Sequence, residues 1–212
     1  TAFDWKQITA DLDRLLKLKT IPIGMKMFKD AEEMKTVPKI RRPKKRYLLD
    51  QIVAQSARLG FTLGITADDL AMKQCGAIAG LMSQDDDWYS GEAMDGVWFE
   101  NREDSAAHQR ALNVVPHGKY EALAVSPLST GRLDPPDICL IYGTPGQMII
   151  LINGLQWKGY KKFEWSVVGE SACADSWGKA LSTGEPSLSI PCYAERRYGG
   201  VLDDEMLMAI PP

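Results

Sequence analysis

The segment Asp137–Tyr142 constrains the fold more than any other part of the sequence. It is an apolar run that follows the turn at 134–136. It is followed closely by Thr144 and Pro145, a helix N-cap and a residue suited to the first helical position. The residues behind them, 146–155, are largely apolar, which predicts a mostly buried helix. A buried strand joined by a short turn to a buried helix requires a sheet with covered faces.

The remaining sequence continues this alternation of apolar strands and helices. We expect further helices at 3–18, 48–59, 105–115 and 171–181, and further strands at 21–28, 120–125, 163–168 and 187–190. The prediction is an α/β fold, with α+β as the open alternative, built on a mixed β-sheet covered by helices. A chain of 212 residues without a clear linker is expected to form a single domain over residues 1–212.

Composition and charge argue against several classes of protein. The net charge of −3 argues against a general nucleic-acid binder. No apolar run reaches the roughly 18 residues that a membrane helix needs. The N-terminal residues 1–5 show no basic-then-apolar signal pattern. We therefore expect a cytoplasmic protein that binds neither nucleic acid nor membrane, with a homo-oligomer left open.

The stretch Lys35–Arg46 is strongly basic and contains Pro38 and Pro43, which keep it from forming a helix. One interpretation is a solvated loop. The other is an electropositive rim that attracts an anionic substrate or an acidic redox partner. The sequence leaves both interpretations open.

The familiar catalytic motifs are absent from the sequence. It has no glycine-rich nucleotide loop, no HExxH zinc motif and no GxSxG nucleophile motif. His108 and His117 lie nine residues apart, which fits no metal-ligand spacing, so both are expected to be exposed or hydrogen-bonded histidines. These absences direct attention to the cysteines.

The four cysteines differ in their local sequence. Cys139 lies within the apolar strand and is expected to be a small buried hydrophobic residue. Cys75 precedes a run of small residues, Cys173 lies at an inferred strand-to-helix junction, and Cys192 lies at an inferred strand end. Such positions are where α/β proteins place their sites, and a helix start favours the thiolate that binds metal. Cys75, Cys173 and Cys192 are therefore candidate metal ligands, with buried, metal-free cysteines as the alternative.

Four segments carry a resemblance that covers nearly the whole chain. They are 16–24 (LKLKTIPIG), 136–147 (PDICLIYGTPGQ), 192–196 (CYAER) and 204–206 (DEM). These segments resemble the family known as domain of unknown function 169, which is found widely in archaea and anaerobic bacteria. Members of that family typically carry cysteines at the positions of Cys75, Cys173 and Cys192. Many carry a fourth cysteine where this chain has Asp50.

The resemblance implies an iron–sulfur cluster of the [4Fe-4S] type, with three cysteine ligands and Asp50 as an exchangeable fourth ligand. Such a protein would belong to anaerobic metabolism. Three functions remain open. The first is an enzyme, an oxidoreductase or lyase that acts on a small-molecule substrate. The second is a non-catalytic electron-transfer or accessory subunit that serves a redox partner. The third is a metal-free small-ligand-binding module.

The candidate catalytic residues are Asp50, Glu195 and Arg196. Asp50 would be a metal ligand or a proton carrier. Glu195 and Arg196 follow Cys192 closely, and an arginine can orient a substrate carboxylate by paired hydrogen bonds. The alternative for Glu195 and Arg196 is a surface salt-bridge network.

The candidate cofactor-binding residues are Gly76, Thr144 and Gly146. Gly76 belongs to the small-residue run after Cys75, which suits close packing against either backbone or a cofactor. Thr144 and Gly146 lie at a helix start, where free N–H groups can hold an anion, with a plain turn as the alternative.

Other candidates lie around Cys173. Glu170 and Asp175 flank this cysteine and are interpreted as tuning or proton-transfer groups, or more simply as helix caps. Three tryptophans are expected in the core or at an interface, and they are Trp157, Trp165 and Trp177.

Overall fold

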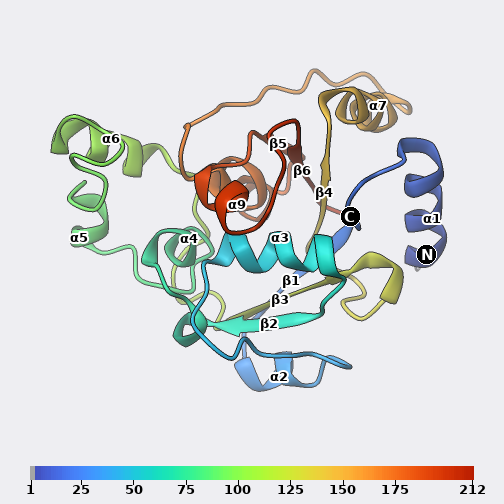
Figure 1. Cartoon of the computed structure of the whole chain (residues 1–212), viewed down its shortest axis with the longest axis horizontal. Coiled ribbons are helices and arrows are strands. Elements are labelled where there is room, and N and C mark those ends of the chain that lie inside the picture. Colours follow the sequence, from blue (N-terminus) through green and yellow to red (C-terminus); the bar gives the residue numbers. More distant parts are fainter. Residues whose placement is uncertain (1–2) are drawn as a thin grey trace.

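A six-stranded sheet forms the centre of the computed structural model, which describes residues 3–212 (Figure 1). The first two residues of the N-terminal segment lie outside the described part. The strands are β1 Ile23–Phe28, β2 Leu63–Thr66, β3 Ala122–Pro127, β4 Ile138–Gly143, β5 Ser187–Ser189 and β6 Met206–Ile210. Their order is β2-β3-β1-β4-β6-β5, and every pairing between them is antiparallel. The predicted class, a sheet covered by helices, is confirmed, and its antiparallel pairing is the α+β form of that prediction.

Helices cover both faces of this sheet (Figure 1). They are α1 Trp5–Leu16, α2 Ala31–Lys35, α3 Leu49–Leu59, α4 Lys73–Ile78, α5 Asp86–Tyr89, α6 Arg102–Ala111, α7 Pro145–Gln156, α8 Lys179–Thr183 and α9 Tyr193–Arg197. A π-helical turn, η3 Ala174–Gly178, precedes α8. Within the described part of the chain, no helix is both long and apolar enough to cross a membrane.

Alternate residues of each strand pack on opposite faces of the sheet. On β1, Met25 belongs to the main core with α3, whereas Phe28 packs with α2. On β4, Tyr142 faces the main core, whereas Cys139 packs with α1. We call these two sides the α3 face and the α1 face. The α3 face also carries α4, η3 and α9, and the α1 face also carries α2 and α7.

Local sequence explains where the main helices begin and end. Asp4 caps α1 by accepting a hydrogen bond from the backbone N–H of Gln7, as its position predicts. Helix α3 ends at Gly60, whose φ of 72° closes the C-terminus in the left-handed region. Helix α7 begins at Thr144 and Pro145, which confirms the predicted N-cap and first helical residue.

Two predictions about the C-terminal half are wrong. Residues 163–168 form an irregular connection and not a strand, because they lie in the long segment between α7 and η3 without a pairing partner. Helix α7 is not mostly buried: only Met148 is buried, and Ile149 is 52% exposed, because the helix packs on the sheet by one side only. Trp157, predicted in the core or at an interface, is 87% exposed; this excludes the core, and the interface stays a prediction.

The basic stretch lies beside strand β2 and extends the edge of the sheet. Arg41 pairs with β2, since its backbone N–H donates to Thr62 and its carbonyl accepts from Gly64. Tyr47 makes a second bridge, to Leu70. The basic side chains between these anchors are exposed, so the stretch covers a sheet edge with charged residues, as natural edges are often protected.

Candidate metal centre

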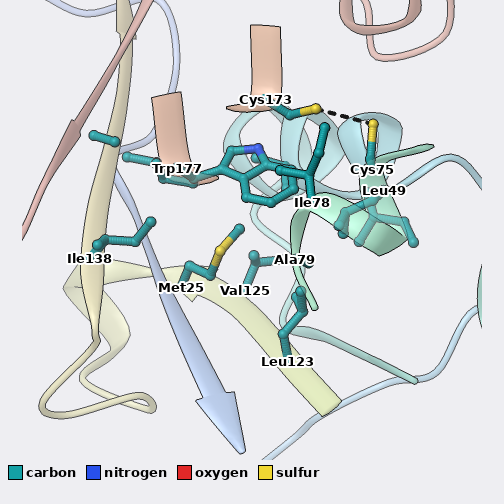
Figure 2. Packing of buried hydrophobic residues seen from close by; sticks show 14 of the residues in the cluster. Met25, Leu49, Cys75, Ile78, Ala79, Leu123, Val125, Ile138, Cys173 and Trp177 are labelled. Carbon is teal, nitrogen blue, oxygen red and sulfur yellow. Dashed lines mark hydrogen bonds between the residues drawn. The ribbon is translucent and has the colours of Figure 1, made fainter. Parts of the chain in front are cut away.

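Three of the predicted ligands meet at one point on the α3 face. The thiol of Cys75 donates a hydrogen bond to Oδ2 of Asp50 at 3.0 Å. The sulfur of Cys173 lies 3.2 Å from the sulfur of Cys75, and Figure 2 shows the two side chains pointing toward each other. One ligand atom from each residue lies within 4.8 Å of the other two, which is compact enough for a metal ion. The structure therefore brings together side chains separated by up to 123 residues in sequence.

Each ligand is carried by a different element. Asp50 lies in the first turn of α3, where a carboxylate is favoured by the helix dipole. Cys75 lies within the short helix α4, and Cys173 precedes the π-helical turn η3, a type of turn that often occurs at functional sites. Trp177 follows in η3, is fully buried, and packs beside Ile78 and the two cysteines (Figure 2).

Cys192 lies at the edge of this group and not within the compact trio. It is the N-cap of α9 and is 5% exposed. It lines the same cavity of about 170 Å³ as Asp50 and Cys75. Burial, and then the charge of Asp50, raise the pKa of Cys192. Cys192 is thus the fourth predicted ligand to reach the site, on the side that opens to the cavity.

Burial sets the protonation of these groups. It raises the pKa of Asp50 to about 6 and is the largest cause of the raised pKa values of Cys173 and Cys192. For Cys75, the hydrogen bond with Cys173 is the largest cause of its raised pKa, followed by burial. Without a cation, the three cysteines are therefore neutral thiols.

The donor set fits a bound metal better than it fits a closed polar network. Asp50 is 2% exposed, and its Oδ1 atom has no hydrogen-bond partner. Within residues 3–212, no salt bridge involves Asp50, so no side-chain cation compensates this buried carboxyl group. An unpaired polar atom costs about 1–3 kcal/mol when buried, and a metal ion would supply the missing partner.

Glu195 lies on α9 beside Cys192. It is buried and hydrogen-bonded, and so it does not belong to the surface salt-bridge network that was the alternative prediction. It is 1% exposed; its Oε2 accepts the backbone N–H of Cys192 at 2.9 Å, and its Oε1 accepts the hydroxyl of Tyr142 at 3.1 Å. Burial raises the pKa of Glu195 to about 8. Glu195 thus fixes the start of α9, and with it the position of Cys192.

Arg196, Thr144 and Gly146 lie elsewhere, whereas Gly76 lies beside Cys75. Arg196 is exposed, with its guanidinium 4.0 Å from Asp203, and it does not line the cavity. At Gly76, which follows Cys75 in α4, an added Cβ atom would meet the side chains of Met82 and Leu70 at 2.6–2.8 Å, so the missing side chain allows close packing, and its cofactor role stays a prediction. Thr144 and Gly146 start α7 on the α1 face, away from the cysteines, and Gln147 caps that helix start. Their prediction as site residues is therefore not supported by their position.

Cys139 is separated from the other cysteines by the sheet. It packs with Trp5 and Leu128 on the α1 face, and it is 8% exposed. Burial raises its pKa to about 12. The prediction that it is a small buried hydrophobic residue is confirmed.

Comparison with known proteins confirms the family resemblance found in the sequence. The model of the domain of unknown function 169 (DUF169) family, described as "Uncharacterised ArCR", matches residues 11–212. The chain belongs to this family. The uncharacterised protein MJ0308 of Methanocaldococcus jannaschii is similar, with 25% identity over 119 residues. The match covers 55% of this chain and 51% of that protein, so it spans about half the length of the curated relative. No solved structure matches the chain.

Some residues around this DUF169 site were not singled out as site residues by sequence reasoning. The cavity beside Asp50 is also lined by Trp98, Tyr193 and Tyr198. Trp98 lies in the turns between α5 and α6, a segment without regular periodicity. Tyr193 begins α9, directly after Cys192, and Tyr198 is the C-cap of that helix. In the sequence, the feature that could have indicated these residues is the pair of tyrosines, which are spaced five residues apart in a stretch of polar residues.

The metal-free chain is expected to lose stability as the pH rises from about 4.5 to about 8. Glu195 has a folded-state pKa of about 8, raised from 4.5, so the folded chain keeps a proton that the unfolded chain releases. The free energy of unfolding then falls with pH across this window. Asp50 acts in the same direction between 3.8 and about 6. Urea unfolding at several pH values measures the slope.

The matched variants for this measurement are Glu195→Gln and Glu33→Gln. Glutamine at position 195 keeps hydrogen-bonding groups but does not titrate, so most of the slope should disappear. Glu33 is exposed, and its replacement should leave the slope unchanged. A steep slope that persists in Glu195→Gln would contradict the assignment.

Proposed function

We propose that this chain binds a [4Fe-4S] cluster through Cys75, Cys173 and Cys192, with Asp50 as an exchangeable fourth ligand. The observation that most strongly supports metal binding here is the convergence of the site. Two cysteines 98 residues apart and a carboxylate from a third element meet at 3.0–3.2 Å, and Cys192 lines the adjoining cavity. Hydrophobic packing alone would not require a buried carboxylate at this point.

The chemistry of the donors supports the same proposal. The raised pKa values of these cysteines keep them as neutral thiols while no cation is present. Iron binds the thiolate form, so a bound cation would favour loss of the thiol protons. Binding of a cation would therefore release protons and remove the cost of burying Asp50. Cysteine thiolates are the usual protein ligands of iron–sulfur clusters.

Asp50 gives the site its proposed reactivity. A carboxylate is a weaker ligand for cluster iron than a thiolate, and Asp50 lines the cavity through which a small molecule could approach. When bound, the cluster would supply redox or Lewis-acid chemistry. Asp50 would then hold a proton at its freed oxygen, and Glu195 and Tyr142 would keep Cys192 in place. This role is consistent with an oxidoreductase or a lyase acting on a small molecule.

A single metal ion is the second candidate. The ligand atoms of Asp50, Cys75 and Cys173 lie within 4.8 Å of one another. In a tetrahedral site with metal–sulfur bonds of about 2.3 Å, neighbouring ligand atoms lie roughly 3.8 Å apart, which is close to this spacing. This candidate would require only a small rearrangement of the three side chains.

Metal analysis of protein purified without oxygen separates these possibilities. The cluster proposal predicts about four iron atoms and about four acid-labile sulfides per chain, with absorbance near about 400 nm. Zinc or iron without sulfide would instead support the single ion. Absence of bound metal after anaerobic purification and after reconstitution with iron and sulfide would contradict both, and would favour the metal-free ligand-binding module.

A further inference from the structure

Three aromatic rings surround the cavity that leads to Asp50. They belong to Trp98, Tyr193 and Tyr198, and all three side chains line this cavity of about 170 Å³. The ring centroids of Trp98 and Tyr193 are 6.2 Å apart, as are those of Tyr193 and Tyr198, and the two tyrosine rings are nearly perpendicular at 86°. We call this set the aromatic cage.

Two carboxyl groups are among the polar groups of the cavity. They belong to Asp50 and Glu170, which both line it. One oxygen of Glu170 accepts the backbone N–H of Tyr193, so Glu170 is held against the cage. Within residues 3–212, no lysine or arginine lines this cavity. The cavity is therefore aromatic and acidic, and none of its described lining residues is a lysine or arginine that could pair with an anion.

A larger cleft gives access to the cage from solvent. Its volume is about 830 Å³, within the roughly 300–1,000 Å³ of small-molecule sites, and it shares four lining residues with the cavity. They are Met72, Gln74, Met94 and Trp98. The one lysine that lines the cleft, Lys73, is bound to Asp85 at 2.6 and 2.8 Å and so is not directed at a ligand.

We infer that the aromatic cage binds a small organic cation, a methylated or quaternary ammonium group. The negative faces of aromatic rings attract such a cation, whose methyl groups also suit an apolar wall. The carboxylate of Glu170 complements its charge, whereas it would repel an anionic substrate. The inference names the substrate class of the proposed metal site, and in that sense it rests on the proposed function.

Binding of choline and of its neutral isostere, 3,3-dimethylbutan-1-ol, tests the inference. The two molecules share shape and hydroxyl group but differ in charge. Isothermal titration calorimetry should show choline binding about tenfold more tightly, which corresponds to about 1.4 kcal/mol of cation recognition. The anionic isostere 3,3-dimethylbutyrate should bind more weakly than either. Equal affinities for choline and the alcohol, or preference for the anion, would overturn the inference.

Two variants locate the recognition in the cage. Trp98→Ala removes a ring, and Glu170→Gln removes a charge but keeps an acceptor for Tyr193; each should reduce choline affinity at least severalfold. Trp157→Ala is the matched control, since Trp157 is 87% exposed and does not line the cavity. Thermal unfolding of each variant verifies that it is folded. Unchanged affinity in both folded cage variants would contradict the assignment.

The Cys173→Ser variant separates this inference from the proposed function. Cys173 does not line the cavity, so the cage remains when metal binding is lost. If the wild type holds no metal but discriminates choline from the alcohol, the cage is supported and the metal site fails. If metal is present without discrimination, the metal site is supported and the inference about the substrate fails.

Discussion

Replacement of Cys173 by serine is expected to remove bound iron almost completely. The sulfur of Cys173 is fully buried and lies 3.2 Å from that of Cys75, so water has no access to replace it as a ligand. A serine hydroxyl is far harder to deprotonate than a thiol and binds iron poorly. Iron and sulfide per chain should fall to less than about a tenth of the wild-type values. Cys75→Ser and Cys192→Ser should have the same effect.

Cys139→Ser is the matched control, because it makes the same chemical change on the opposite face of the sheet. This variant should keep its metal, although a hydroxyl in an apolar cluster will lower its stability somewhat. Circular dichroism distinguishes loss of metal from loss of fold. Normal iron content in a folded Cys173→Ser variant, or loss of iron from a folded Cys139→Ser variant, would refute the ligand assignment.

Trp177→Ala should destabilise the metal-free chain by about 3–5 kcal/mol, the usual range for removal of a buried large aromatic side chain. Trp177 is 0% exposed and belongs to the main core, where it packs between the sheet and α4 (Figure 2). Its loss leaves a cavity in the core cluster that also contains Cys75 and Cys173. Urea unfolding under reducing, metal-free conditions measures the change.

The same truncation at Trp157 gives the control, since 87% of that side chain is already in solvent. Surface replacements of this kind usually change the free energy of unfolding by no more than about 0.5 kcal/mol. A small effect at Trp177, or an equal effect at both tryptophans, would contradict the packing of η3 in this fold.

Periodicity predicted those parts of the fold that carry a clear local signal. The run Asp137–Tyr142 with its helix-starting Thr144 and Pro145 gave both β4 and the start of α7, because buried strands and helix caps depend on neighbouring residues. The predicted strand 163–168 failed because its apolar residues have no pairing partner, which the local sequence does not encode. The same limit explains the exposed side of α7, whose burial depends on what packs around it.

The site was predictable to a similar degree. Helix starts and the family resemblance pointed to the cysteines and to Asp50, and the structure brings Asp50, Cys75 and Cys173 together. The aromatic cage escaped prediction, since Trp98 lies in turns that have no periodicity and reaches the site only through tertiary packing. Arg196 was placed near the site by sequence adjacency alone, but an exposed helix side directs it to solvent.

The separation of Cys75 and Cys173 along the chain has a consequence for the lifetime of the protein. A metal held by both would act as a cross-link that closes a loop of 98 residues, and closure of such a loop by a disulfide is worth about 4–5 kcal/mol in the chain-entropy model. Because an ion that binds only the native state shifts the unfolding equilibrium, the fraction of unfolded chain would depend on metal supply. Cells short of metal would then degrade this protein faster, and its abundance would follow their iron status.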